Sequence, residues 1–206
     1  MEFMHQQGWE VMGIDFSREG ISHWNPDMTP FFLQGNIYKL LDDINATHKH
    51  YNIIHLGNVI EHVLEPENLL LKIKKILSSD GILIIVAPND FSQLQNHLLL
   101  NNYVDEKYFL AYPDHLSYFN KESMSMFLTE LGYNIIEIIS DFPIEFNLLT
   151  ESTNYVKNKN IGKSVHRQRI KFENMFFEQD PQILIDIYRA LGKNGLGRNL
   201  IYYCTK

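Results

Sequence analysis

The chain has 206 residues, a net formal charge of −7 at pH 7, 45% hydrophobic and 21% charged residues. This composition is typical of a folded domain with one core, and it excludes a disordered or collagen-like chain. The longest apolar run, Ile82–Ala87, is far shorter than the roughly 20 residues that cross a bilayer. The negative charge argues against nucleic acid as a partner, and the single cysteine favours a reducing compartment. We expect a cytoplasmic protein, with no membrane partner and one domain over residues 1–206.

Short β-rich segments alternate with helical patterns along the first half of the chain. Strands are predicted at 9–14 and, more weakly because of Pro30, at 29–33. Two further strands, 51–56 and 81–87, are apolar on both faces, as in parallel sheets that helices cover. Between these two, a helix is predicted from Pro66 to a stop at Gly81. Its apolar stripe consists of Leu69, Leu70, Ile73, Ile76 and Leu77.

The second half continues this alternation. A helix capped by Asn120 leads to a strand at 134–140, and a last strand covers 199–204. This order predicts an α/β fold with a doubly wound, mostly parallel sheet. Residues 91–114 follow a strand's carboxyl end and form a candidate lid. Residues 142–198 contain two expected helices, at about 165–179 and 181–191, and form a helical insertion that serves as a cap or a dimerisation surface.

Asp15 is the first candidate site residue. It ends an early strand, where nucleotide-binding sheets place a carboxylate that accepts hydrogen bonds from ribose hydroxyls. The alternative is that Asp15 caps the following helix through its side chain. The residue alone does not decide between these interpretations.

Several segments together resemble a known family. They are GWEVMGIDFS, FLQGNIYKL, YNIIHLGNVIEHVLEPENLLLKIKKILSSDGILIIVAPN, DHLSYFNKESMSMFLTELGYNIIEI and GRNLIYYCTK. In this order they are similar to class I S-adenosylmethionine-dependent methyltransferases of the small-molecule type. The resemblance implies a Rossmann-like methyltransferase fold and S-adenosylmethionine as cofactor. It also implies that Asp15 binds the ribose, that Asn36 and Ile37 contact the adenine, and that Gly57 and Asn58 line the pocket near the methionine part.

One part of the family pattern has no counterpart in this sequence. The family's first strand and its Gly-rich turn are missing, and residues 1–8 resemble the end of the helix that follows that turn. We therefore expect an N-terminally incomplete fold. An alternative function follows, a truncated or non-catalytic methyltransferase-like subunit. Such a subunit pairs through an exposed sheet edge, with a partner or in a homo-oligomer.

The catalytic candidates are His62 and His115. His62 lies just after a central strand, where such sheets carry out their chemistry, and His115 lies near the candidate lid. Either can act as the general base that deprotonates a hydroxyl acceptor, or can simply pack beside its turn. Asn58, Glu61 and His62 are also similar to the ligands of magnesium-dependent O-methyltransferases of RNA ends and ubiquinone synthesis. Because the amide of Asn58 replaces a carboxylate there, we assign no metal site and keep an RNA or quinone methyltransferase as an alternative.

The acceptor is the least determined part of the prediction. Six Lys and Arg residues lie within 157–171 without an acidic residue, which indicates either a solvated helix face or a patch for an anionic acceptor. The long insertion is similar to that of methyltransferases associated with surface polysaccharides. We therefore expect methyl transfer to oxygen or nitrogen of a small molecule, with a sugar or a polysaccharide precursor favoured.

Overall fold

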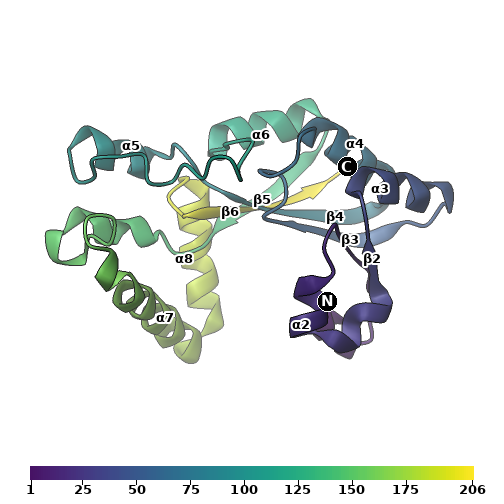
Figure 1. Ribbon diagram of the computed structural model, residues 1–206, viewed down its shortest axis with the longest axis horizontal. Helices are drawn as coiled ribbons and strands as arrows, with labels where there is room; N and C mark the ends of the chain where they lie inside the picture. Colours follow the sequence, from purple (N-terminus) through teal and green to yellow (C-terminus); the bar gives the residue numbers. More distant parts are fainter. The chain divides into compact units, whose positions relative to one another are not determined.

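The computed structural model describes residues 1–206 (Figure 1). The chain divides into two compact units. The first unit consists of Met1–Tyr51 and Glu67–Ser78, and the second of Asn52–Pro66 and Ser79–Lys206. None of the helices combines the length and the apolar character needed to cross a lipid bilayer.

The first unit holds a small parallel sheet with helices. Its elements are α1 (Glu2–Gln6), β1 (Gly13–Asp15), α2 (Glu19–Trp24), the 3-10 helix η1 (Pro26–Phe31), β2 (Phe32–Gln34) and α3 (Ile37–Ala46). β1 and β2 pair in parallel, with Asp15 opposite Gln34. Both strands are shorter than predicted. In the second, Pro26 and Pro30 lie in η1, because proline fixes φ at a helical value and donates no hydrogen bond to a sheet.

The apolar stripe of the helix predicted to begin at Pro66 is confirmed. The predicted end of that helix, at Gly81, is wrong. The helix α4 (Pro66–Ile76) runs directly into β4 (Leu77–Pro88), so Gly81 lies inside a strand instead of stopping a helix. Ser78, Ser79 and Asp80 precede that glycine, and such residues favour non-helical backbone because their side chains compete for its hydrogen bonds. All five stripe residues are buried, together with the first unit's Met28, Phe32, Leu41 and Ile44.

The second unit contains a four-stranded sheet in the order β3 (Tyr51–Gly57), β4, β6 (Asn199–Thr205), β5 (Asn134–Ser140). β6 pairs antiparallel with both β4 and β5, so these two strands run in the same direction. The strands predicted at 134–140 and 199–204 are confirmed, as is the Asn120 cap of α6 (Lys121–Glu130). The expected Rossmann-like α/β class is therefore observed.

The strand β3 was predicted to be buried on both faces, and it is not. It is hydrogen-bonded to β4 alone, while β1 pairs only with β2, so each of these strands has one unpaired edge. Asn52, Ile53 and His55 of β3 are exposed. Successive side chains of a strand point to opposite faces of the sheet, so the exposure of these residues means that both faces of β3 are partly uncovered.

The insertion before β6 forms the two expected helices, α7 (Gly162–Gln179) and α8 (Pro181–Lys193). α8 packs on β5, and α7 packs on α8 (Figure 1). Three short 3-10 helices precede them: η2 (Ile144–Leu149), η3 (Glu151–Thr153) and η4 (Lys159–Ile161).

The candidate lid is attached to this insertion. Its helix α5 (Gln93–Leu100) begins with a capping box formed by Ser92 and Gln95. One small core unites side chains of both segments, namely Leu94, Leu98, Val104 and Leu148. The buried amide of Asn154 donates from Nδ2 to the carbonyl oxygens of Tyr103 (2.8 Å) and Leu148 (3.1 Å). The two stretches therefore form one packed body.

Candidate active site

Two strained turns mark the carboxyl ends of β3 and β4. Asn58 (φ +51°) and Phe91 (φ +56°) adopt the left-handed backbone that non-glycine residues rarely occupy. The Asn58 amide donates to the carbonyl of Val86 (2.9 Å), which fixes the first turn. The ring of Phe91 packs edge-on against Phe109 and Tyr118, which holds the second. Strained turns persist where the surroundings impose them, and they gather at functional sites.

The loop before α6 crosses these strand ends. Leu116 and Ser117 donate their backbone N–H groups to the carbonyl of Glu61, at 2.7 and 3.1 Å. Further along, the Asp90 amide donates to the carbonyl of Phe119 at 2.7 Å. These bonds hold the loop directly over the turns that follow β3 and β4.

The loop brings the two predicted histidines together. The rings of His62 and His115 meet edge to face, with centroids 4.8 Å apart. Glu61 Oε1 lies 3.8 Å from His62 Nε2, and one donor atom of each of the three residues lies within 4.8 Å of the others. Glu61 is 2% exposed, and its Oε2 has no hydrogen-bond partner in the protein. This arrangement can hold or move a proton, and it can also bind a cation.

The hydrogen bond of His62 determines which ring nitrogen is free. Its Nδ1 lies 2.7 Å from the carbonyl oxygen of Asp114. A carbonyl oxygen only accepts, so Nδ1 carries the hydrogen and Nε2 carries the lone pair of the neutral ring. Since the His62 side chain is 43% exposed, Nε2 is within reach of a bound molecule.

A second polar group adjoins the histidines. Asp90 Oδ2 is 4.0 Å from His115 Nδ1, while Asp90 Oδ1 accepts from Arg198 Nη1 at 2.8 Å. Arg198 Nε in turn lies 3.6 Å from Glu145 Oε1, which also accepts from Gln95 Nε2 at 3.3 Å. Asp90, Glu145 and Arg198 thus continue the site from the ends of β3 and β4 to the 3-10 helix η2.

Burial governs the ionisation of this site. It raises the pKa of Glu61, an effect that the neighbouring histidines partly oppose. It likewise raises the pKa of Glu145, against the opposing charge of Arg198. The pKa of Tyr108 is raised by burial and by the charge of Glu145, so its hydroxyl keeps its proton. The site therefore disfavours additional negative charge.

In the first unit, Asp15 performs the role of a local turn residue. It ends β1 with an exposed side chain, and its Oδ1 accepts from the Ser17 amide at 2.9 Å. The Ser17 hydroxyl accepts from the Glu19 amide at 3.2 Å, so the residues before α2 are stabilised by both side chains. Ribose binding by Asp15 stays a prediction.

Asn36 and Ile37 follow β2, whose last residue, Gln34, pairs with Asp15. Gly35 donates its amide to the Asp15 carbonyl at 3.0 Å, and Asn36 follows as the N-cap of α3. The Asn36 Oδ1 accepts from the amides of Tyr38 and Lys39, at 3.0 and 3.2 Å, while Ile37 is half-buried as the first residue of the helix. Capping uses the oxygen of the Asn36 amide. An adenine contact, which stays a prediction, would therefore use its nitrogen.

The remaining predicted cofactor residues end β3 in the second unit. Gly57 is the last residue of the strand, and a Cβ there would lie 2.6 Å from the His55 ring. Asn58 forms the strained turn described above. No contact in the structure tests their expected place near the methionine part.

Sequence reasoning missed two members of the site. Asp90 lies just beyond the carboxyl end of β4 and Asp15 at the carboxyl end of β1, so the rule that selected Asp15 also points to Asp90. Glu145 lies in a short 3-10 helix of the insertion, and no local pattern indicates it. Both are at least 98% buried, which makes them the least solvated carboxylates of the site together with Glu61.

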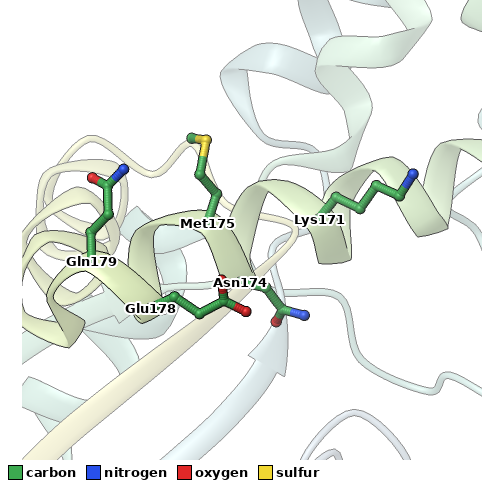
Figure 2. Close-up of a pocket in the computed structure, with 5 residues that line it drawn as sticks. All are labelled: Lys171, Asn174, Met175, Glu178 and Gln179. Carbon is green, nitrogen blue, oxygen red and sulfur yellow. The ribbon is translucent and has the colours of Figure 1, made fainter.

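A surface hollow elsewhere is a weaker candidate. It has a volume of about 450 Å³ and is lined by Lys171, Asn174, Met175, Glu178 and Gln179. Figure 2 shows that all five side chains project from one helix, α7, and all five are exposed. Ligand sites bring polar groups of several elements together in a partly enclosed space, which this hollow does not do.

Comparison with known proteins supports the expected family. The sequence profile of a family described as "Methyltransferase domain" matches residues 1–138. No curated protein matches the chain significantly. Among solved structures, a SAM-dependent methyltransferase from Archaeoglobus fulgidus has a TM-score of 0.54 at 17% identity, over 100% of this chain and 80% of its own. A possible histamine N-methyltransferase from Thermotoga maritima has a TM-score of 0.53 at 13% identity. The match covers 99% of this chain and 76% of that protein's chain.

A third similar structure contains bound molecules. It is the plantazolicin methyltransferase BamL in complex with a triazolic desmethylPZN analog and SAH. Its TM-score is 0.55 at 14% identity, with 100% of this chain and 71% of that chain covered. At such identities the three structures establish the fold.

Proposed function

Because the chain belongs to the methyltransferase domain family and uses S-adenosylmethionine as its methyl donor, we propose that the acceptor is an oxygen or nitrogen atom of a small molecule. The grouping of Glu61, His62 and His115 at the end of β3 carries this proposal. Ligands of open α/β sheets bind at the carboxyl ends of the strands, where these side chains lie.

The sulfonium of S-adenosylmethionine supplies an electrophilic methyl group when it is bound. The protein's part is to hold the acceptor in line and to remove its proton as attack proceeds. His62 Nε2 carries the free lone pair, so it takes the proton from an acceptor hydroxyl. The carboxylate of Glu61, 3.8 Å away, then stabilises the imidazolium. His115 positions the His62 ring through their edge-to-face contact.

For the cofactor, we assign Asp15, Asn36 and Ile37 to the adenosine part and Gly57 with Asn58 to the methionine part. An exposed carboxylate at the end of β1 is chemically suited to accept from two ribose hydroxyls. The hydrogen bond between Gly35 and Asp15 supports the first group, since it keeps the ends of β1 and β2 together.

Calorimetric titration with S-adenosylhomocysteine tests cofactor binding by the folded chain. We expect a micromolar Kd, which corresponds to about −8 kcal/mol. Asp15→Ala should weaken binding at least tenfold, whereas Asp43→Ala, which removes the same charge from an exposed position of α3, should not. Folded protein that binds no S-adenosylhomocysteine would support the alternative of an incomplete subunit. Equal binding by both variants would contradict the role of Asp15.

His62→Gln tests the proton transfer. With an acceptor found by screening, we expect kcat to fall by about 10²- to 10⁴-fold, because the positioned base that takes the acceptor's proton is lost. His166→Gln, an exposed substitution on α7, is the matched control. An unchanged kcat in His62→Gln would place the base elsewhere.

A second candidate is metal-assisted methyl transfer, as in the RNA and quinone enzymes considered above. Glu61, His62 and His115 offer one carboxylate and two imidazoles with donor atoms within 4.8 Å of one another. This donor set suits iron, zinc or manganese better than magnesium, which prefers oxygen ligands and retains water. Activity that is indifferent to a chelator would exclude this candidate, and loss of activity restored by one dication would favour it.

A further inference from the structure

The side chains of Asp90 and His115 face each other inside the second unit. Asp90 Oδ2 lies 4.0 Å from His115 Nδ1, and both atoms are buried without a hydrogen-bond partner in the protein. The two side chains are 1% and 15% exposed. A buried polar atom without a partner is costly to the fold, and here two such atoms stand opposite each other. Each atom is therefore placed to pair with the other.

Asp90 is fixed through its other oxygen and through the residue before it. Its Oδ1 accepts from Arg198 Nη1 at 2.8 Å. The buried side chain of Asn89 donates from Nδ2 to the carbonyls of Gly195 and Gly197, at 2.8 and 2.9 Å, which ties this turn to the one that precedes β6. The carboxylate of Asp90 thus has one oxygen committed to Arg198 and presents the second oxygen in a fixed place.

The ring of His115 is the movable member of the pair. It contacts His62 edge to face, with centroids 4.8 Å apart, and Tyr118 at 5.9 Å. Neither ring contact is a hydrogen bond, so the ring can still turn. A hydrogen bond between nitrogen and oxygen needs about 2.7–3.2 Å, so a displacement of about 1 Å joins His115 Nδ1 to Asp90 Oδ2.

This hydrogen bond selects one tautomer of His115. A carboxylate oxygen only accepts, so Nδ1 carries the hydrogen and Nε2 carries the lone pair of the neutral ring. In the other tautomer, a lone pair on Nδ1 would face the carboxylate of Asp90 across a buried gap, which is repulsive. Another nearby carboxylate, that of Glu61, already lies 3.8 Å from His62 Nε2. His62 has its hydrogen on Nδ1 as well, through the carbonyl of Asp114. The two histidines therefore take the same tautomer.

We propose that Asp90 is a positioning residue of the methyltransferase site, which fixes His115 in the Nδ1–H tautomer and so holds its ring against His62. This inference rests on the proposed function, in which His62 is the base, and adds a residue that acts through His115. A ring held by Nδ1 cannot turn over, so it presents the same edge to His62 throughout the reaction. The base then keeps the orientation in which it meets the acceptor.

Asp90→Asn reverses the hydrogen-bonding character of this contact. Arg198 only donates, so the amide oxygen of the asparagine stays with Arg198 and its NH₂ group faces His115. Because that NH₂ group donates, Nδ1 must then carry the lone pair. We expect His115 to have the Nδ1–H tautomer in the wild type and the Nε2–H tautomer in the variant. Asp80→Asn makes the same change at an exposed position of β4, and this matched control should leave the tautomer unchanged.

Long-range ¹H–¹⁵N correlation spectra of the imidazole rings report the tautomer directly. They are recorded on the full chain at about pH 8.5, where neutral imidazole predominates, and His115→Gln identifies the signal by its absence. The wild-type spectrum needs no substitution, so it decides the question even if Asp90→Asn fails to fold. An Nε2–H tautomer of His115 in the wild type would overturn the proposal. An unchanged tautomer in folded Asp90→Asn would overturn it as well.

Turnover separates positioning from a purely structural role. With an acceptor found by screening, we expect Asp90→Asn to lower kcat by about tenfold to a hundredfold, because the base is held less well. The KM of the acceptor and the Kd of S-adenosylhomocysteine should change less than twofold, and Asp80→Asn should change none of these. Full kcat in folded Asp90→Asn would contradict the positioning role. Full kcat in His62→Gln would instead count against the proposed function, whereas the tautomer of His115 is measured independently of activity.

Discussion

Replacing Glu145 by Gln should stabilise the protein at alkaline pH and change little at acidic pH. Burial raises the pKa of Glu145 above its ordinary value of 4.5. The folded state therefore holds the proton of Glu145 more tightly than the unfolded state does. The stability that this group contributes is complete below pH 4.5 and is lost as the pH rises through the raised pKa. Glutamine does not titrate, so the difference between the two proteins should increase with pH.

The magnitude follows from the contacts of the carboxylate. Glu145 Oε2 is buried without a partner, and the glutamine leaves a neutral amide in the same place, so the substitution removes only the cost of burying the negative charge, about 1–3 kcal/mol. Arg198, 3.6 Å from Oε1, offsets part of this cost, and in the variant it keeps its bond to Asp90. We expect a net gain of about 1–2 kcal/mol at pH 8. This corresponds to roughly 2–8 °C in Tm for a chain of this size.

Denaturant unfolding of both proteins at several pH values between 4.5 and 8.5 measures this difference. Asp43→Asn, an exposed substitution on α3 that also removes one negative charge, controls for the change in net charge. If Glu145→Gln were less stable than the wild type at pH 8, the ion pair with Arg198 would outweigh the burial of the carboxylate. The reasoning would then be wrong. A difference that does not vary with pH would contradict it as well.

Two further substitutions test local features of the fold. Asn36→Ala removes the N-cap of α3 and should cost about 1 kcal/mol in unfolding free energy, whereas Asn36→Asp keeps a capping oxygen and should cost less. Gly197→Ala places a Cβ 2.2 Å from that of Ser140 and 2.8 Å from the Asp141 carbonyl, so we expect a loss of about 1–3 kcal/mol in denaturant unfolding. Gly162→Ala, where nothing lies within 4 Å, should be neutral or slightly stabilising. Equal effects of the two glycine substitutions would contradict the close packing at Gly197.

Local patterns were sufficient to predict most elements of the fold. The strand at 134–140 and the helix capped by Asn120 are confirmed, because periodicity and capping are encoded within a few residues. The end of α4 was predicted wrongly because Gly81 is only one of several signals for a helix end. Ser78, Ser79 and Asp80 before it already favour non-helical backbone.

Part of the candidate site was predicted as well, because the position of a residue relative to a strand can be read from the local sequence. His62 was predicted from its position after a strand and His115 from its place near the candidate lid, whereas Glu61 was noted only through the similarity to metal-dependent methyltransferases. Glu145 reaches Arg198 over 53 positions of the sequence, and their interaction depends on how the insertion folds back on the sheet. A single sequence carries no local signal for such a pair.

The attachment of α5 to the insertion has a consequence for protein engineering. Asn154 and the small core around Leu98 and Leu148 join segments that lie about fifty positions apart. A chimera that exchanged either segment alone with another methyltransferase would leave apolar surface and a buried amide without their complements. Recombination of acceptor specificity between relatives should therefore succeed only when both segments are transplanted together.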